Sequence, residues 1–242
     1  MTTLNVNTIK PAGATLNLGE SGDSVVLADD VKVNLVKDVG ANTLWSSNGS
    51  GVVSSVATGI GGADKLLATT TVTLGSSVAS VAFTSGIDST YKEYIFVGIN
   101  VHLSGLGRFE WIPSDDGGSS YGMTITSTGF VDVHYENNAS YGVTYDAAYD
   151  LAQQAIAQPF AAGHEIVNDA NIAFRLHLFN PASTTYVKNF YAYALSNSQH
   201  PGAYNARTAG YINDTAAVNA IKFVPVTGNV DAGIFKLYGI AS

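Results

Sequence analysis

Residues 112–123, IPSDDGGSSYGM, contain two adjacent carboxylates that could bind a metal or take part in acid–base chemistry. Calcium takes about six to eight oxygen ligands, supplied in binding loops by alternating positions and a distal bidentate carboxylate. Asp115 and Asp116 are adjacent, and no Glu follows at the required distance. An Asp-Gly pair between the alternating segments FEWI and YGMTI is instead a hairpin signal. We therefore predict a turn at Asp115, Asp116, Gly117 and Gly118, and no metal site.

Further carboxylates in the same part of the chain, Glu110, Asp132 and Glu136, raise the possibility of glycoside hydrolysis. A glycosidase needs two carboxyl groups at a defined separation on either side of the sugar. The chain has 19 acidic residues, so some grouping is expected by chance. We predict no catalytic residue and expect that the protein is not an enzyme.

The five histidines are the remaining candidate metal ligands: His102, His134, His164, His177 and His200. None stands in an H-x-H or H-x₃-H pair that would direct two imidazoles to one metal. The chain contains no cysteine, which excludes disulfides, thiolate catalysis and Cys-bound zinc. It also has no nucleophile elbow and no phosphate-binding or dinucleotide-binding motif. We expect neither a metal nor a cofactor.

Tyrosine and asparagine gather in two segments, HYENNASYGVTYDAAY and SNSQHPGAYNARTAGY. Tyr with Asn and Ser makes adaptable recognition surfaces at low entropic cost, and sugars stack on aromatic rings. The candidate recognition surface comprises Tyr135, Asn137, Asn138, Tyr141, Tyr145, Tyr204, Asn205 and Tyr211. The alternative is that these side chains fill a subunit interface or an edge of the fold, because aromatic residues also dominate interfaces.

The elements that must position these residues are short strands. In NIAFRLHLF the apolar side chains from Ile172 to Leu178 alternate with Arg175 and His177, which should face outward. TYVKNFYAYAL also alternates, with aromatic residues on both faces. Many such strands separated by turn signals predict an antiparallel β-sandwich or jelly-roll-like domain over residues 63–242.

Two segments of this domain carry more specific expectations. EYIFVGINVHL predicts one unbroken strand, with odd-numbered residues from Ile95 to Leu103 on one face and Phe96 and Asn100 on the other. TYDAAYDLAQQAIAQPF, residues 144–160, is rich in Ala and Gln. It predicts two to three helical turns at one edge of the sandwich.

The N-terminal segment is poor in the residues that build a core. Trp45 is the only aromatic residue before Phe83, so residues 1–62 cannot form a large core alone. Residues 31–35 alternate like a half-buried strand, and residues 59–62 hold three glycines that suggest a boundary. Because small isolated sheets are marginally stable, we predict an oligomerising β stem. The alternative is a small sheet docked on the main domain.

Charge and hydropathy exclude several classes of function. The net charge is −8, with only 11 Lys and Arg residues and no cluster of them, so we expect no nucleic-acid binding. No apolar run approaches the ~20 residues of a membrane span, so we expect no membrane insertion. The first residues lack a basic segment followed by an apolar core, so no secretory signal is expected.

Several turns and strand ends resemble a known module. GIDSTYKEYIFV, LFNP with TTYVK, and the ending GIFKLYGI are similar to the β-sandwich module of tailed-phage virion proteins, especially marine and cyanophage tail-fibre-like proteins. NTIKPAGATLNLGESGDSVVLADDVKVN resembles the stem segments of such fibres. The resemblance implies a non-enzymatic virion structural protein, a homotrimer whose N-terminal segment attaches to other virion proteins.

From these observations we expect a tail fibre whose distal sandwich adheres to a host-surface glycan through several weak sites acting together. One alternative is a purely structural protein of the capsid or neck. A less favoured alternative is a polysaccharide depolymerase, because the resemblance implies that phage depolymerases usually build their grooves on longer β-helices.

Overall fold

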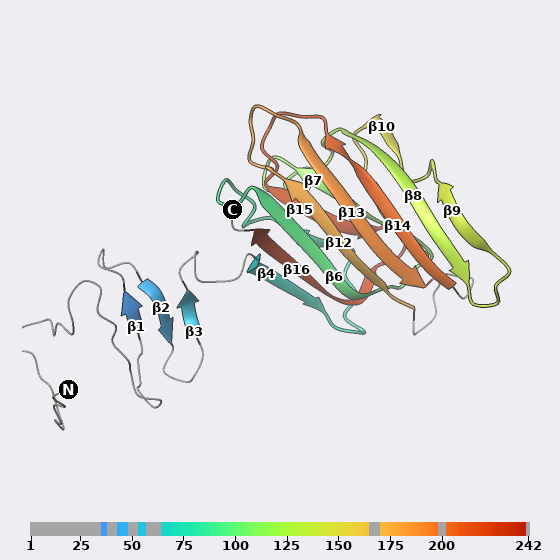
Figure 1. Cartoon of the computed structure of the whole chain (residues 1–242), viewed down its shortest axis with the longest axis horizontal. Coiled ribbons are helices and arrows are strands. Elements are labelled where there is room, and N and C mark those ends of the chain that lie inside the picture. Colours follow the sequence, from blue (N-terminus) through green and yellow to red (C-terminus); the bar gives the residue numbers. More distant parts are fainter. Residues whose placement is uncertain are drawn as a thin grey trace, which may run out of the picture. The chain divides into compact units, whose positions relative to one another are not determined.

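The computed structural model describes residues 35–37, 43–47, 53–56, 64–164, 170–197 and 202–240. All regular secondary structure in these residues is β-strand in antiparallel sheets, which confirms the all-β prediction (Figure 1). The chain divides into two compact units, Met1–Ala57 and Thr58–Ser242. The predicted boundary between residues 62 and 63 lies outside the described residues and stays a prediction.

In the first unit, three short strands form one antiparallel sheet in the order β1 (Leu35–Lys37), β2 (Thr43–Ser47) and β3 (Val53–Val56). Trp45 of the middle strand pairs with Val36 on one side and Val56 on the other. The earlier residues of the predicted stem strand lie outside the described part of the chain. Oligomerisation through this unit stays a prediction.

The second unit is a sandwich of two unequal antiparallel sheets. The large sheet has nine strands. All but one follow the order β10 (Leu151–Gln154), β8 (Ile125–Tyr135), β14 (Gly202–Ile212), β13 (Lys188–Asn197), β12 (Ile172–Phe179), β6 (Glu93–Leu103), β16 (Val230–Ile240) and β4 (Asp64–Val72). The remaining strand, β9 (Tyr141–Tyr145), pairs with β8. The small sheet has the order β11 (Gln158–His164), β7 (Gly107–Ser114), β15 (Ala220–Pro225) and β5 (Val81–Phe83). Most neighbours in space are therefore not neighbours in sequence.

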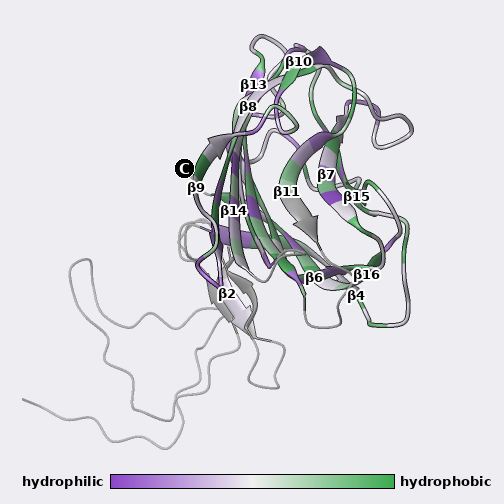
Figure 2. Ribbon diagram, turned by 90° about the vertical axis from the view of Figure 1, so that its right-hand side faces the viewer, coloured by the Kyte–Doolittle hydropathy of each residue, from purple (hydrophilic) through white to green (hydrophobic). Residues whose placement is uncertain are grey.

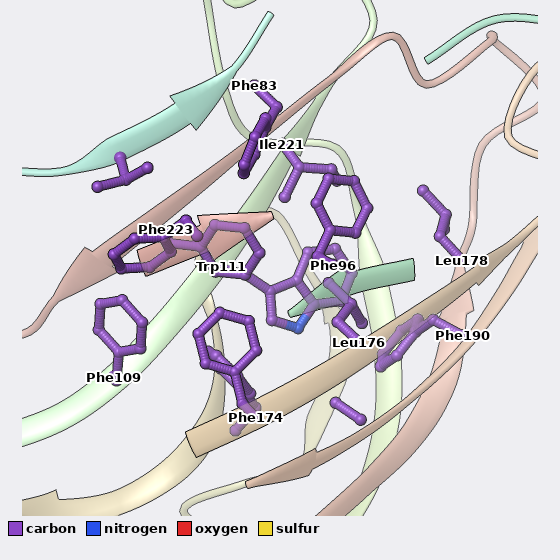
Figure 3. Packing of buried hydrophobic residues seen from close by; sticks show 14 of the residues in the cluster. Phe83, Phe96, Phe109, Trp111, Phe174, Leu176, Leu178, Phe190, Ile221 and Phe223 are labelled. Carbon is purple, nitrogen blue, oxygen red and sulfur yellow. The ribbon is translucent and has the colours of Figure 1, made fainter. Parts of the chain in front are cut away.

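The core lies between the two sheets, whose layers Figure 2 shows from the side. Aromatic rings from both layers fill it, as Figure 3 shows around Trp111. Phe174 of the large sheet lies 6.0 Å from Phe109 and 5.0 Å from Phe223 of the small sheet, measured between ring centroids. The Trp111 ring meets Phe190 edge-on at 4.8 Å. Because aromatic side chains bury large apolar areas and pack in tilted pairs, this cluster supplies much of the stabilisation of the sandwich.

The predicted alternation of β12 is confirmed. Ile172, Leu176 and Leu178 are fully buried, and Arg175 faces solvent. The strand lies in the middle of the large sheet, between β6 and β13. One of its faces therefore contributes to the core, and the other belongs to the outer surface of the large sheet.

The prediction of one unbroken alternation along β6 is wrong. Val101 and Leu103 are fully buried, on the same side as Phe96, whereas the side chain of Ile99 is 37% exposed. The pairing register shifts against both β12 and β16 in this region, and Asn100 has φ of 50°. A β-bulge inserts one extra residue, so the side-chain alternation reverses along the strand. Asn tolerates the left-handed conformation better than most residues.

The helix predicted in residues 144–160 is also wrong, because this segment forms β10 and β11 at the edges of the two sheets. Leu151 is buried as an edge residue of the large sheet, and Gln153 has φ of 58°, which no right-handed helix allows. The Gln158 side chain is buried, and its Nε2 donates to the carbonyl of Tyr149 at 2.8 Å. Tertiary burial thus overrides the helical propensity of Ala and Gln.

Candidate functional site

The loop at residues 115–118 uses its acidic group to hold its own shape. Ser114 Oγ donates to Asp116 Oδ1 at 2.7 Å, and the Ser120 hydroxyl donates to Asp116 Oδ2 at 2.6 Å. The backbone N–H of Ser120 donates to the same carboxylate at 2.9 Å. These hydrogen bonds, those from Ser120 first, lower the pKa of Asp116 from 3.8 to about 2. The carboxylate acts as an acceptor within a turn.

The same loop connects the two sheets, so the hairpin expected between its flanking strands does not form. Its leading strand, β7, pairs with β11 and β15, whereas β8 belongs to the large sheet. Gly117 and Gly118 adopt φ of 74° and 88°, which favours glycine. Asn219 holds the loop from outside, since its Nδ2 donates to the Asp115 carbonyl at 2.8 Å and its Oδ1 accepts from the Gly117 N–H at 2.7 Å.

The other carboxylates considered for catalysis lie on separate elements. Glu110 is on β7 of the small sheet, where burial raises its pKa and neighbouring Arg108 opposes that rise. Asp132 lies on β8 of the large sheet and forms an ion pair with Arg207. Glu136 follows the end of β8. These three carboxylates therefore belong to different local environments.

The histidines are also dispersed. Three have described polar partners: His102 with Asp231, His134 with Asn138 and His177 with Glu93, at 3.4, 3.1 and 2.6 Å between the nearest side-chain atoms. His164 ends β11 and its side chain, like all of His200, lies outside the described residues. Among the residues that the structure describes, no group of three His, Asp or Glu side chains could hold a metal ion.

The structure divides the predicted recognition surface. Strand alternation and register place four of its residues on the outer face of the large sheet: Tyr141, Tyr145, Asn205 and Tyr211. Tyr135 and Tyr204 point to the opposite side, where the Tyr204 hydroxyl donates to the Tyr135 hydroxyl at 3.1 Å. Asn137 and Asn138 lie in the β8–β9 turn, where Asn138 has φ of 58° and Asn137 Oδ1 accepts from the Ala139 N–H at 2.8 Å. The eight residues therefore form no single surface.

A different set of residues lines a hollow of about 550 Å³ on the outer face of the large sheet. We call it the outer groove, and it is lined by Val97, Gly98, Ile99, Ala173, Phe174, Arg175, His177, Tyr191, Tyr193 and Leu195. Three adjacent strands, β6, β12 and β13, supply these residues.

Two smaller hollows share walls with the outer groove. One of about 160 Å³ is also lined by Tyr191 and Tyr193, together with Phe130 and Arg207. The other, of about 220 Å³, is also lined by Arg175. The outer groove therefore continues along the sheet in both directions across the strands.

One side of the outer groove is an aromatic wall formed by His177, Tyr191 and Tyr193, and strand register explains how it forms. His177 pairs with Tyr191, and Arg175 pairs with Tyr193, so all four side chains share one face. The rings of His177 and Tyr191 stack at 4.3 Å with an interplanar angle of 18°. Tyr191 and Tyr193 meet edge to face at 5.7 Å, and Tyr193 remains 50% exposed. The fold thus stacks the Tyr191 ring against His177 and leaves Tyr193 half exposed.

The polar groups of the wall are fixed by neighbours. His177 Nδ1 lies 2.6 Å from Glu93 Oε1, and the carboxylate accepts a hydrogen bond from the imidazole N–H, which orients the ring. Burial first, and then the negative charge of Glu93, raise the pKa of Tyr191, while Arg175 lowers it. Tyr191 therefore keeps its phenolic proton at neutral pH and can both donate and accept a hydrogen bond.

This arrangement suits the binding of a ligand with a flat apolar face and polar edges. Tyr191, Tyr193 and Arg175 were not predicted as site residues. The available sequence signal was the alternation in TYVKNFYAYAL, which places aromatic residues on the solvent face as well as the core face. A central strand with aromatic residues on both faces indicates that its outward rings contact something other than the core.

Among the described residues, no helix is long and apolar enough to cross a membrane. Comparisons of the chain with protein-family models, with curated proteins and with solved structures find no match.

Proposed function

We propose that this chain is a non-enzymatic structural protein of a tailed-phage particle, a homotrimeric tail fibre whose C-terminal sandwich adheres to a host-surface glycan. The sequence resemblance supports the phage setting, the homotrimer and attachment through residues 1–62. The observation that carries the adhesive role is the outer groove, a hollow of about 550 Å³ with an aromatic wall.

The geometry of the groove supports a sugar ligand. Its volume lies within the roughly 300–1,000 Å³ range of small-molecule sites. The half-exposed ring of Tyr193 offers a flat surface for the apolar face of a pyranose. Arg175, His177 and the Tyr191 hydroxyl lie at the edges of this surface and can hydrogen-bond to ring substituents.

The environment of nearby carboxylates favours binding over catalysis. Glu93 is held by His177, and Asp132 is held by Arg207. A glycosidase needs two carboxyl groups facing each other across the sugar, whereas each of these two is bound to a different side chain. These two carboxylates therefore suit the positioning of other side chains.

A single exposed groove of this kind would bind weakly, so adhesion requires several copies. Three grooves on one trimeric fibre act at a high effective concentration once the first has bound. The combined affinity then exceeds that of one site without further contacts.

The adhesive role is tested by binding of the full chain to a panel of surface glycans, with Tyr193→Ala as the diagnostic variant. Loss of a central aromatic contact should weaken binding about tenfold or more. Tyr186→Ala is the matched control, because Tyr186 is 70% exposed and lies in the loop before β13, outside the groove lining. Equal affinities of Tyr193→Ala and the unsubstituted chain would contradict the proposed site.

The setting is tested by labelling particles of a phage whose genome encodes this chain with an antibody raised against the chain. Label at the tail tip is the expected result. Absence of label from intact and disrupted particles would contradict a virion role.

A structural role on the capsid or neck is the second candidate, and strand β9 is the observation that favours it. All five residues of β9 are exposed, and among the described strands β9 pairs with β8 alone. An open edge with apolar residues is suited to pairing with another chain. Label repeated over the capsid lattice would support this candidate, and release of reducing ends from bound polysaccharide would support a depolymerase.

A further inference from the structure

We propose that the ligand of the outer groove is an anionic glycan whose carboxylate or sulfate group is bound by Arg175. This inference rests on the proposed adhesive function and specifies the chemistry of its ligand.

The position of Arg175 is set by a row of paired residues across the large sheet. Tyr193 of β13 pairs with Arg175 of β12, Arg175 pairs with Val97 of β6, and Val97 pairs with Lys236 of β16. All four side chains point to the outer face, and Arg175 is exposed. The row therefore places an aromatic ring, a guanidinium, a small apolar side chain and an ammonium side by side.

Arg175 and Lys236 differ from Arg207 and His177, the other basic residues near the groove, in their acidic partners. Arg207 forms an ion pair with Asp132, and His177 is bound to Glu93. Neither Arg175 nor Lys236 forms an ion pair with any residue in the described ranges. Asp64 also lines the hollow of about 220 Å³ without forming an ion pair with Arg175. The positive charge at the groove is therefore available to a ligand.

The chemistry of guanidinium identifies the ligand group. Its planar fork donates two parallel hydrogen bonds to a carboxylate or sulfate, and these bonds are stronger than those between neutral groups. Directly paired residues in a sheet have Cβ atoms about 4.5–5.5 Å apart. A pyranose stacked on Tyr193 would therefore hold an acidic substituent within range of Arg175.

Because the whole chain is negatively charged, binding of an anionic glycan depends on a cation at the site itself. With a net charge of −8, the protein repels anionic polymers over long distances. An acidic glycan can then bind only where a close cation offsets this repulsion. Because the site is exposed, binding to it should weaken as salt screens the pair.

The experiment measures binding of the full chain to matched pairs of immobilised oligosaccharides. Oligogalacturonate is paired with its methyl ester, and a sulfated galactan oligomer with its desulfated form, so each pair keeps its rings and linkages. The variant is Arg175→Gln. The control is Lys222→Gln, which removes one positive charge from the small sheet, where Lys222 lies over the Tyr121 ring at 4.0 Å.

We expect the unsubstituted chain and Lys222→Gln to prefer the acidic member of at least one pair, and Arg175→Gln to lose about tenfold or more of that affinity. The preferred pair shows whether a carboxylate or a sulfate is bound. Equal binding to charged and neutral members would overturn the anionic ligand, and acidic binding that survives Arg175→Gln would overturn Arg175 as the group that binds it; both results would leave adhesion intact. If the chain binds no member of either pair, the anionic ligand is overturned. If it also binds no other neutral or host-derived glycan, the adhesive function itself is overturned.

Discussion

Gly98 allows a core phenylalanine to lie against the backbone of β6, and adding one methyl group there should disrupt the core. A Cβ on Gly98 would lie 2.7 Å from Cζ of the Phe174 ring and closer still to Cε1 and Cδ1. Carbon atoms in contact prefer separations of about 3.5–4.0 Å. In Gly98→Ala, the ring or the strand must therefore move.

The packing of Phe174 determines the size of the effect. Its side chain is 4% exposed, and its ring centroid lies 5.0 Å from both Phe160 and Phe223. Because the neighbouring rings are also buried, the Phe174 ring cannot move further into the core without displacing them. Overpacking of this kind costs about 1–3 kcal/mol of unfolding free energy. For a domain of this size, the midpoint of thermal unfolding should fall by roughly 2–12 °C.

A double-mutant cycle with Phe174→Leu tests the cause. A smaller side chain should accept the new methyl group, so Gly98→Ala should cost less than about 1 kcal/mol when it is combined with Phe174→Leu. The reporter is Trp111, which is buried against Phe190. A background substitution of Trp45→Phe makes Trp111 the sole tryptophan, so its fluorescence in a urea titration follows the sandwich alone.

Two results would refute this account of the core. One is a cost below about 0.5 kcal/mol for Gly98→Ala, the size of a neutral surface substitution. The other is an equal cost of Gly98→Ala with and without Phe174→Leu, which would place the strain elsewhere.

Two other features lead to predictions about stability. Because the folded pKa of Asp116, about 2, lies below its ordinary 3.8, its contribution is complete above that ordinary pKa and is lost as pH falls toward the folded value. Asp116→Asn should therefore flatten the decline of the thermal midpoint between these values, and an unchanged acid profile would contradict the proposed role of the loop hydrogen bonds. The buried Lys188 Nζ donates to the carbonyls of Asp214 at 2.9 Å and Ala216 at 2.5 Å. Lys188→Met should lower the unfolding free energy measured in urea by about 1–3 kcal/mol, because it leaves both acceptors without their donor; full stability would mean that other groups satisfy them.

Sequence patterns predicted the all-β class and the faces of β12, because alternation directly reflects which side chains are buried. They did not predict the bulge at Asn100. Ile99 and Val101, on either side of Asn100, are both apolar, so the sequence gives no sign that the alternation reverses there. They also misassigned residues 144–160, where burial of Leu151 and Gln158 in two different sheets outweighs local propensity. Long-range pairing decided both cases.

The candidate site was harder to predict than the fold. Counting tyrosines identified Tyr135 and Tyr204 together with Tyr141, but these residues point to opposite sides of the large sheet. The outer groove arises from the side-by-side pairing of β6, β12 and β13. In sequence, β6 is separated from β12 by five other strands. A composition pattern within one segment cannot show which distant strand completes a surface.

The open edge of β9 restricts the symmetry of any assembly in which β9 pairs with β9 of another copy. Because β9 has one edge paired with β8, its other edge can join a copy of itself only in an isologous contact. An isologous contact relates two chains by a two-fold axis and is complete once they have paired. Three chains cannot close through β9 alone. A threefold fibre must therefore be held by contacts other than β9 with β9, and a β9–β9 contact would then link one fibre to another.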